Sequence, residues 1–156
     1  MATFGSSARR APIPDPRVDR LVRLFESLAR SDVPRLHEFY ASNARFKDPF
    51  NDVVGVPRIE RIFAHMFEAL DEPRFVVHDI VIDGDQCLLT WDFLFRFRRF
   101  GRGLQTVHGA SHLRFDTEGK VSLHRDYWDA AEELYAKLPL IGALMRWLRR
   151  RAQAPQ

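Results

Sequence analysis

Cysteine is nearly absent from this sequence, since Cys87 is the only one among 156 residues. A single cysteine excludes an intramolecular disulfide and a cysteine-rich metal cluster, and it favours a reducing, cytoplasmic location. Long apolar runs are missing too: none approaches the roughly 18 residues that a membrane-spanning helix needs, and the N-terminus lacks the apolar core of a signal peptide. With 46% apolar residues, the chain is expected to be one soluble globular domain.

Motifs for cofactors and metals are also lacking. The only closely spaced glycines, in Gly101-Arg102-Gly103, read as a hairpin turn and do not form a phosphate-binding loop. His108 and His112 have no further ligand at metal-binding spacing. We therefore expect neither a metal nor a cofactor.

Strong net charge is the third absence. Basic residues number 24 and acidic residues 21, and the densest basic cluster is Arg146 with Arg149, Arg150 and Arg151. Because this cluster has no exposed aromatics or recognised motif beside it, nucleic-acid binding is not expected. Residues 139–152 instead predict an amphipathic helix that docks on the fold or on a second subunit, with contact to a membrane surface as the less favoured alternative.

Apolar residues at helical spacing predict three helices in the first half of the chain. They begin at Asp15-Pro16, at Ser31-Asp32 and at Pro57. Before them, residues 1–14 are small, polar and proline-containing, and they predict a disordered leader.

Beyond residue 73 the apolar period changes to two. Residues 75–83 and 86–98 predict one hairpin, and residues 104–116 and 121–129 predict another. Helices followed by a meander of long strands indicate an α+β domain over residues 15–138, with the helices on one face of a curved sheet.

The strand at residues 44–50 carries the most informative side chain. Alternation places Ala44, Phe46 and Asp48 on one face, and Arg45 and Lys47 on the face that water reaches. An aspartate is thus directed toward the apolar interior, where it is expected to be paired, partly hydrated or able to exchange protons. The alternative is a plain capping role in the turn before residue 49.

The strand at residues 89–97 has two different faces. Its odd positions are apolar and mostly aromatic, from Leu89 to Phe97, while its even positions include Asp92 and Arg96. Both faces must be covered, so we expect the aromatic face to pack against a second subunit or the C-terminal helix. The even face would then line a partly polar cavity.

Three features together resemble the SnoaL-like and ketosteroid isomerase group of the nuclear-transport-factor-2-like superfamily. They are the order of elements, the Phe46-x-Asp48-Pro49 run followed by Gly55, and the closing Tyr127-Trp128-Asp129. The resemblance implies a cone-shaped fold in which a curved, mostly antiparallel sheet is wrapped by three N-terminal helices around a deep apolar pocket. It also implies a homodimer through the outer sheet face.

The same resemblance implies site residues. Asp48 falls at the general-base position of ketosteroid isomerase, and Asp126 at a catalytic aspartate of cyclases and limonene epoxide hydrolase. His124 or Asp92 would assist. The positions expected to bind substrate are Leu24, Phe46, Phe63, Phe67, Leu94, Ser111 and Trp128. Leu24 and Ser111 stand where ketosteroid isomerase keeps its oxyanion donors, so steroid isomerisation is not expected.

Two functions from different classes follow. The first is a cofactor-free enzyme that exchanges protons between Asp48, Asp126 and a small apolar molecule, in an isomerisation, an aldol-type cyclisation or a hydration. The second is a ligand-binding or dimerisation module without chemistry, because this fold serves both.

Overall fold

The computed structural model describes residues 10–98 and 103–133. The predicted helix over 139–152, most of the predicted turn at 101–103, and residues 1–9 of the predicted leader lie outside the described residues. The elements in chain order are α1 (Pro16–Ser27), the 3-10 helix η1 (Arg30–Glu38), β1 (Tyr40–Lys47), β2 (Asp52–Val54), α2 (Val56–Ala69), β3 (Leu70–Asp83), β4 (Gln86–Phe97), β5 (Gln105–Phe115), β6 (Val121–Tyr127) and α3 (Ala130–Glu133).

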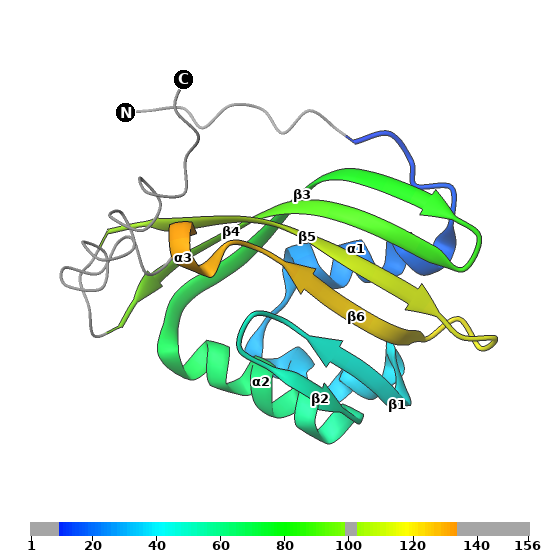
Figure 1. The fold of residues 1–156 in the computed structure, drawn as a ribbon, viewed down its shortest axis with the longest axis horizontal. Coiled ribbons are helices and arrows are strands. Elements are labelled where there is room, and N and C mark those ends of the chain that lie inside the picture. Colours follow the sequence, from blue (N-terminus) through cyan, green and yellow to red (C-terminus); the bar gives the residue numbers. More distant parts are fainter. Residues whose placement is uncertain (1–9, 99–102, 134–156) are drawn as a thin grey trace, which may run out of the picture.

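One six-stranded sheet organises the molecule. Its strand order is β2-β1-β6-β5-β4-β3, and every neighbouring pair is antiparallel except β1 with β6. The sheet curves so that α1 and α2 lie on its concave side (Figure 1). The α+β class with a curved, mostly antiparallel sheet is therefore confirmed.

The predicted helix starts are confirmed, with one change in helix type. Asp15 caps α1 by accepting a hydrogen bond from the backbone N–H of Arg17 at 2.8 Å, and Pro16 occupies the first turn. The second predicted helix is η1, a 3-10 helix that contains Pro34. The short strand β2 was not predicted, because only three residues form it and they lie at the sheet edge, two of them exposed.

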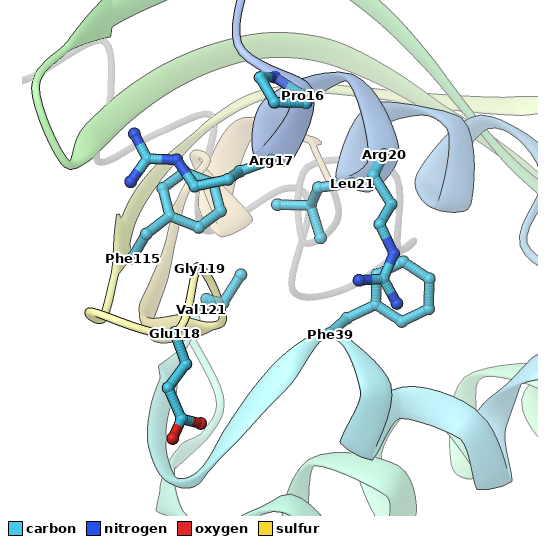
Figure 2. Close-up of a pocket in the computed structure, with 9 residues that line it drawn as sticks. All are labelled: Pro16, Arg17, Arg20, Leu21, Phe39, Phe115, Glu118, Gly119 and Val121. Carbon is cyan, nitrogen blue, oxygen red and sulfur yellow. The ribbon is translucent and has the colours of Figure 1, made fainter.

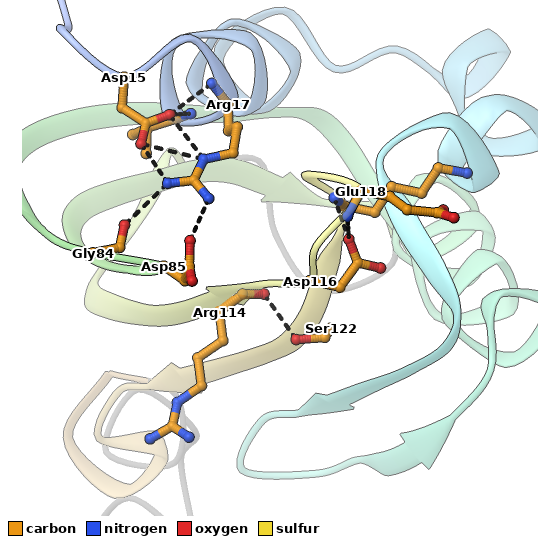
Figure 3. Close-up of polar contacts among 10 residues, drawn as sticks. Asp15, Arg17, Gly84, Asp85, Arg114, Asp116, Glu118 and Ser122 are labelled. Carbon is orange, nitrogen blue, oxygen red and sulfur yellow. Dashed lines mark hydrogen bonds and ion pairs between the residues drawn. The ribbon is translucent and has the colours of Figure 1, made fainter.

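Both predicted hairpins are present. Gly84 takes a positive φ of 57° in the turn between β3 and β4, a conformation that glycine adopts without strain. In the turn between β5 and β6, the Asp116 carboxylate accepts hydrogen bonds from the backbone N–H groups of Glu118 and Lys120, both at 2.9 Å (Figure 3). Local side-chain chemistry thus sets the register of the long strands.

The predicted assignment of the two faces of β4 was wrong. Leu89 is fully buried, and Trp91 and Phe95 are only 6% and 4% exposed. These odd positions face the helices, whereas Thr90 is exposed on the other face. The aromatic side chains need no second subunit to cover them because they wall the interior of the same chain. The expected homodimer stays a prediction, without this face as its support.

Part of the expected disordered leader contacts the fold. Arg10 forms an ion pair with Glu26 of α1 at 2.8 Å and donates to the carbonyl oxygen of Val77 in β3. Ile13 packs against the core. Residues 10–14 therefore follow the surface of the domain.

Candidate active site

Asp126 of β6 is at the centre of a hydrogen-bonded cluster on the inner face of the sheet. Its Oδ1 accepts from the Ser111 hydroxyl at 2.5 Å and lies 2.8 Å from Nε2 of His124. No hydrogen bond to Oδ2 is found within residues 10–98 and 103–133. The cluster therefore positions the carboxylate by one oxygen and leaves the other available.

His124 is buried, at 3% exposure, and both of its ring nitrogens are engaged. Nδ1 lies 2.7 Å from the hydroxyl of Tyr40, and Nε2 faces Asp126. A carboxylate accepts, so Nε2 donates to Asp126, and the Tyr40 hydroxyl is the hydrogen-bond partner of Nδ1. The hydrogen-bond network thus fixes the orientation of the His124 ring through both of its nitrogens.

Tyr40 is held in its neutral form by its surroundings. Burial raises the pKa of Tyr40 well above its usual 10.0, and the nearby charge of Asp126 raises it further. The hydroxyl therefore stays protonated and is the hydrogen-bond partner of Nδ1 of His124.

Trp91 of β4 completes the cluster from the neighbouring strand. Its indole Nε1 donates to the Ser111 hydroxyl at 2.8 Å, so the serine proton is directed to Asp126. Gly109 lies opposite Trp91 in the β4–β5 pairing, and a Cβ atom added there would come within 2.3 Å of the indole ring. Glycine is thus the residue that leaves space for this ring.

Two adjoining spaces open beside the cluster, and Asp126 lines both. The inner pocket, about 70 Å³, is lined by Phe46, Phe63, Ser111 and His124 among others. The larger space, which we call the main cavity, has a volume of about 390 Å³. The residues that line the main cavity are Asp48, Phe50, Asn51, Ile62, His65, Met66, Ala69, Leu70, Phe75, Trp91, Phe93, Phe95, Phe97, Val107, Asp126 and Trp128.

Asp48 lines the main cavity and also caps the turn that follows β1. Its Oδ1 accepts from the backbone N–H groups of Phe50 at 2.8 Å and Asn51 at 2.6 Å, while the Asn51 amide reaches both carboxylate oxygens. The structure therefore brings Asp48 and Asp126 to one cavity. Asp48 also has the capping role that the sequence left open as an alternative.

Asp92 lies on the outer face of the sheet, away from this cluster. It contacts Nε2 of His78 at 2.9 Å and Nδ1 of His108 at 2.5 Å. Burial opposes ionisation there, but these two hydrogen bonds keep the pKa of Asp92 below its usual value. The expectation that Asp92 assists in the pocket is corrected, because β4 turns its even positions outward.

Some of the residues that were expected to bind substrate line the two spaces, and the others lie elsewhere in the fold. Phe46, Phe63, Ser111 and Trp128 line one of the two spaces. Leu24 lies in the core at 8% exposure, and Phe67 packs against that core. Leu94 shares the outward parity of Asp92, so its expected place in the pocket is also corrected.

Sequence reasoning missed Tyr40 and Trp91 as members of the site. Tyr40 lies outside the strand predicted at residues 44–50, whereas β1 begins at Tyr40. Trp91 was on the face assigned to a partner, because alternation along β4 could not say which face was inside.

A second pocket, of about 240 Å³, lies between α1, the residue after η1 and the β5–β6 turn (Figure 2). Arg17 and Arg20 stack on Phe115 and Phe39 at its wall, with guanidinium-to-ring distances of 4.9 and 4.3 Å.

Arg17 is already paired within the fold. Its guanidinium donates to Asp15, to the carbonyl of Gly84 and to Asp85 (Figure 3). These hydrogen bonds raise its pKa. The main cavity, where Oδ2 of Asp126 receives no hydrogen bond from the described residues, is the better candidate for chemistry.

Metal-binding geometry is not found in the described part of the chain, where no group of three histidine, cysteine or acidic side chains could hold an ion. No described helix is both long and apolar enough to cross a membrane.

Comparison with known proteins identifies the family and the fold. Residues 21–124 match the model of the SnoaL-like domain. No curated protein matches the chain. Solved structures do match, and their sequence identities are high enough to establish the fold but nothing more.

Three of these structures show how the proteins that share this fold differ in their names. A protein from Jannaschia sp. CCS1, provisionally named a SnoaL-like polyketide cyclase, is 18% identical and has a TM-score of 0.65 over 79% of this chain and 92% of its own. A protein with a ketosteroid isomerase-like fold from Catenulispora acidiphila, solved with trimethylamine, is 14% identical with a TM-score of 0.67 over 80% and 94%. An LEH-like epoxide hydrolase from M. tuberculosis is 16% identical with a TM-score of 0.61 over 85% and 93%.

The family match covers well over half of the 156 residues, and the structural matches extend over most of the described fold. The protein therefore belongs to the SnoaL-like family and has its cone-shaped, nuclear-transport-factor-2-like fold.

Proposed function

We propose that this SnoaL-like protein is a cofactor-independent acid/base enzyme that acts on a small, largely apolar organic molecule in the main cavity. The observation that carries the proposal is the Asp126 carboxylate, which Ser111 and His124 hold on Oδ1, which receives no hydrogen bond on Oδ2 from the described residues, and which lines both spaces. A base that is positioned through one oxygen and open through the other is suited to proton abstraction.

The supporting residues fix this base in place. Trp91 orients Ser111, and Tyr40 holds the ring of His124, so both groups that contact Asp126 are themselves held in place. Preorganised hydrogen bonds of this kind reduce the rearrangement needed during proton transfer. Asp126 would remove a proton from a carbon acid or from water, and Asp48 on the same cavity wall is the second group able to exchange a proton.

The reaction class is an isomerisation, an aldol-type cyclisation or a hydration. The names of two structural relatives, a polyketide cyclase and an epoxide hydrolase, fall within this range. Steroid-type isomerisation is disfavoured for this chain because the Ser111 hydroxyl donates to Asp126 and is not available to a developing oxyanion.

A test compares Asp126→Asn with Asp92→Asn in a panel of unsaturated ketones, β-dicarbonyl compounds and epoxides. We expect Asp126→Asn to lower turnover by roughly 100-fold or more, as is usual for loss of a general base. Asp92→Asn, on the opposite face of the same sheet, should leave turnover within about twofold, because surface changes rarely disturb a remote site. Equal activity of the wild type and Asp126→Asn would refute the proposal.

The alternative is a ligand-binding module without chemistry. The hydrogen bonds of Asp48 within its turn favour this alternative, because they explain the presence of that carboxylate without any catalytic role. Ligands that bind with similar affinity to the wild type and Asp126→Asn, with no turnover of any panel compound, would support this alternative.

A further inference from the structure

Aromatic side chains make up much of the wall of the main cavity. They come from the β1–β2 turn, from β3, from β4 and from the end of β6, and they are Phe50, Phe75, Trp91, Phe93, Phe95, Phe97 and Trp128. Neighbouring rings touch one another: Phe50 meets Trp128 at 5.4 Å, and Phe75 meets Phe93 at 4.5 Å between centroids. A ligand inside would be surrounded by π systems.

The acidic side chains of this wall outnumber the basic ones, since two aspartates line the main cavity and His65 is the one basic side chain among its lining residues in the described part of the chain. Asp48 and Asp126 line the main cavity, and no lysine or arginine is among its lining residues in the described part of the chain. The hydrogen bonds to the two carboxylates come from backbone N–H groups, the Asn51 amide, the Ser111 hydroxyl and the His124 ring. Neither carboxylate is paired with a lysine or an arginine of the described residues.

From these two observations we infer that the main cavity binds an organic cation, a tertiary or quaternary ammonium carrying an apolar body. The faces of aromatic rings attract ammonium groups, most strongly where water is excluded. Carboxylates at the same wall add Coulomb attraction in a medium of low dielectric constant. An inorganic cation is a poorer match because few oxygen ligands converge there.

The inference names the substrate class of the proposed enzyme and rests on the proposed function only for the choice of cavity. Binding of the cation requires no proton transfer, so the two can fail separately. A protein that prefers cations but turns over nothing would retain this inference and lose the enzyme proposal.

The experiment compares benzyltrimethylammonium with neopentylbenzene, its uncharged isostere, in the same cosolvent. Binding to the full chain is followed by the shifts of the tryptophan indole N–H signals in NMR titrations. We expect the cation to bind about tenfold or more tightly, because ring and carboxylate attraction add to an equal apolar contact. Phenylacetate, an anion of similar size, should bind more weakly than either.

Two variants separate the contributions. Trp128→Leu keeps an apolar wall but removes a ring, and it should weaken cation binding about threefold to tenfold while changing the isostere less. Asp126→Asn should reduce the ratio of the affinity for the cation to the affinity for its isostere. Asp52→Asn, outside the cavity on β2, should leave this ratio unchanged.

Equal affinity of the wild type for the cation and its isostere would overturn the inference. The same holds if Trp128→Leu and Asp126→Asn, both folded by circular dichroism, keep the full cation preference. The wild-type comparison stands alone if either variant fails to fold.

Discussion

Two aspartates line the main cavity, and their contacts distinguish them at the scale of single residues. Asp48 accepts hydrogen bonds on both oxygens from its own turn, whereas the contacts of Asp126 come from two other side chains and fall on one oxygen. The contacts of Asp48 are explained by the turn that its carboxylate stabilises. The contacts of Asp126 with a serine and a buried histidine have no such explanation in the local backbone. Asp126 is therefore the stronger candidate for chemistry.

Tyr40→Phe tests the cluster at this scale. At neutral pH it removes the hydrogen-bond partner of Nδ1 of His124, and leaving that buried nitrogen unpaired should lower the free energy of unfolding by about 1–3 kcal/mol. Because the folded-state pKa of Tyr40 is raised above its unfolded value, its contribution is complete below pH 10.0 and is lost as pH rises beyond it.

Urea unfolding at pH 7 and at pH 11 measures both effects. The wild type should lose more stability than Tyr40→Phe between the two pH values. Burial also raises the pKa of the Cys87 thiol, to about 11, but that residue is present in both proteins and cancels in the difference. Identical losses would show that Tyr40 ionises normally and is not buried as described.

At the scale of elements, β4 decides where the cavity is. Its odd side chains, such as Trp91, Phe93 and Phe95, wall the main cavity, and on the outer face its even residue Asp92 contacts two histidines. One strand thus supplies both a large part of the cavity wall and the exterior of the sheet. A shift of its register by one residue would exchange the two.

Leu89→Ala and Leu88→Ala form a matched pair on this strand. Leu89 is fully buried and Leu88 is 49% exposed, although they are neighbours of the same type. We expect Leu89→Ala to lower the free energy of unfolding by about 2–5 kcal/mol, from lost burial and a new cavity. Leu88→Ala should change it by about 0.5 kcal/mol or less. Chemical denaturation gives both values, and equal losses would contradict the face assignment.

At the scale of the whole molecule, the N-terminal segment, α1 and β3 meet at one carboxylate. Glu26 accepts from Arg10 at 2.8 Å and from the backbone N–H of Val77 at 3.1 Å. Arg10 in turn donates to the Val77 carbonyl. This contact fixes α1 against the strand whose Phe75 walls the main cavity.

Glu26→Ala should weaken this junction. Removing the acceptor leaves the Val77 N–H without its partner, and since the pair is partly exposed we expect a loss of about 1 kcal/mol. Glu26→Gln keeps an acceptor and should lose less than half as much. Thermal denaturation measures the difference, and hydrogen exchange at Val77 should quicken in Glu26→Ala. Unchanged exchange would show that this contact does not stabilise the junction.

The sequence by itself determined the class of fold, the family, the hairpins and the inward direction of Asp48. These follow from local period, turn chemistry and quoted motifs, all of which depend on neighbours along the chain. Alternation also separated the two faces of β4 correctly, with aromatics on one and Asp92 on the other. It could not say which face was inside.

Only the tertiary structure decided which face of β4 is inside, because the inner face is the one that α1 and α2 cover. The same holds for the cluster of Tyr40, Trp91, Ser111, His124 and Asp126, which joins β1, β4, β5 and β6. Its members are up to 86 residues apart in the sequence, and hydrogen bonds of about 3 Å between them require the sheet to be assembled. The position of Asp126 beside the aromatic wall exists only in the folded chain.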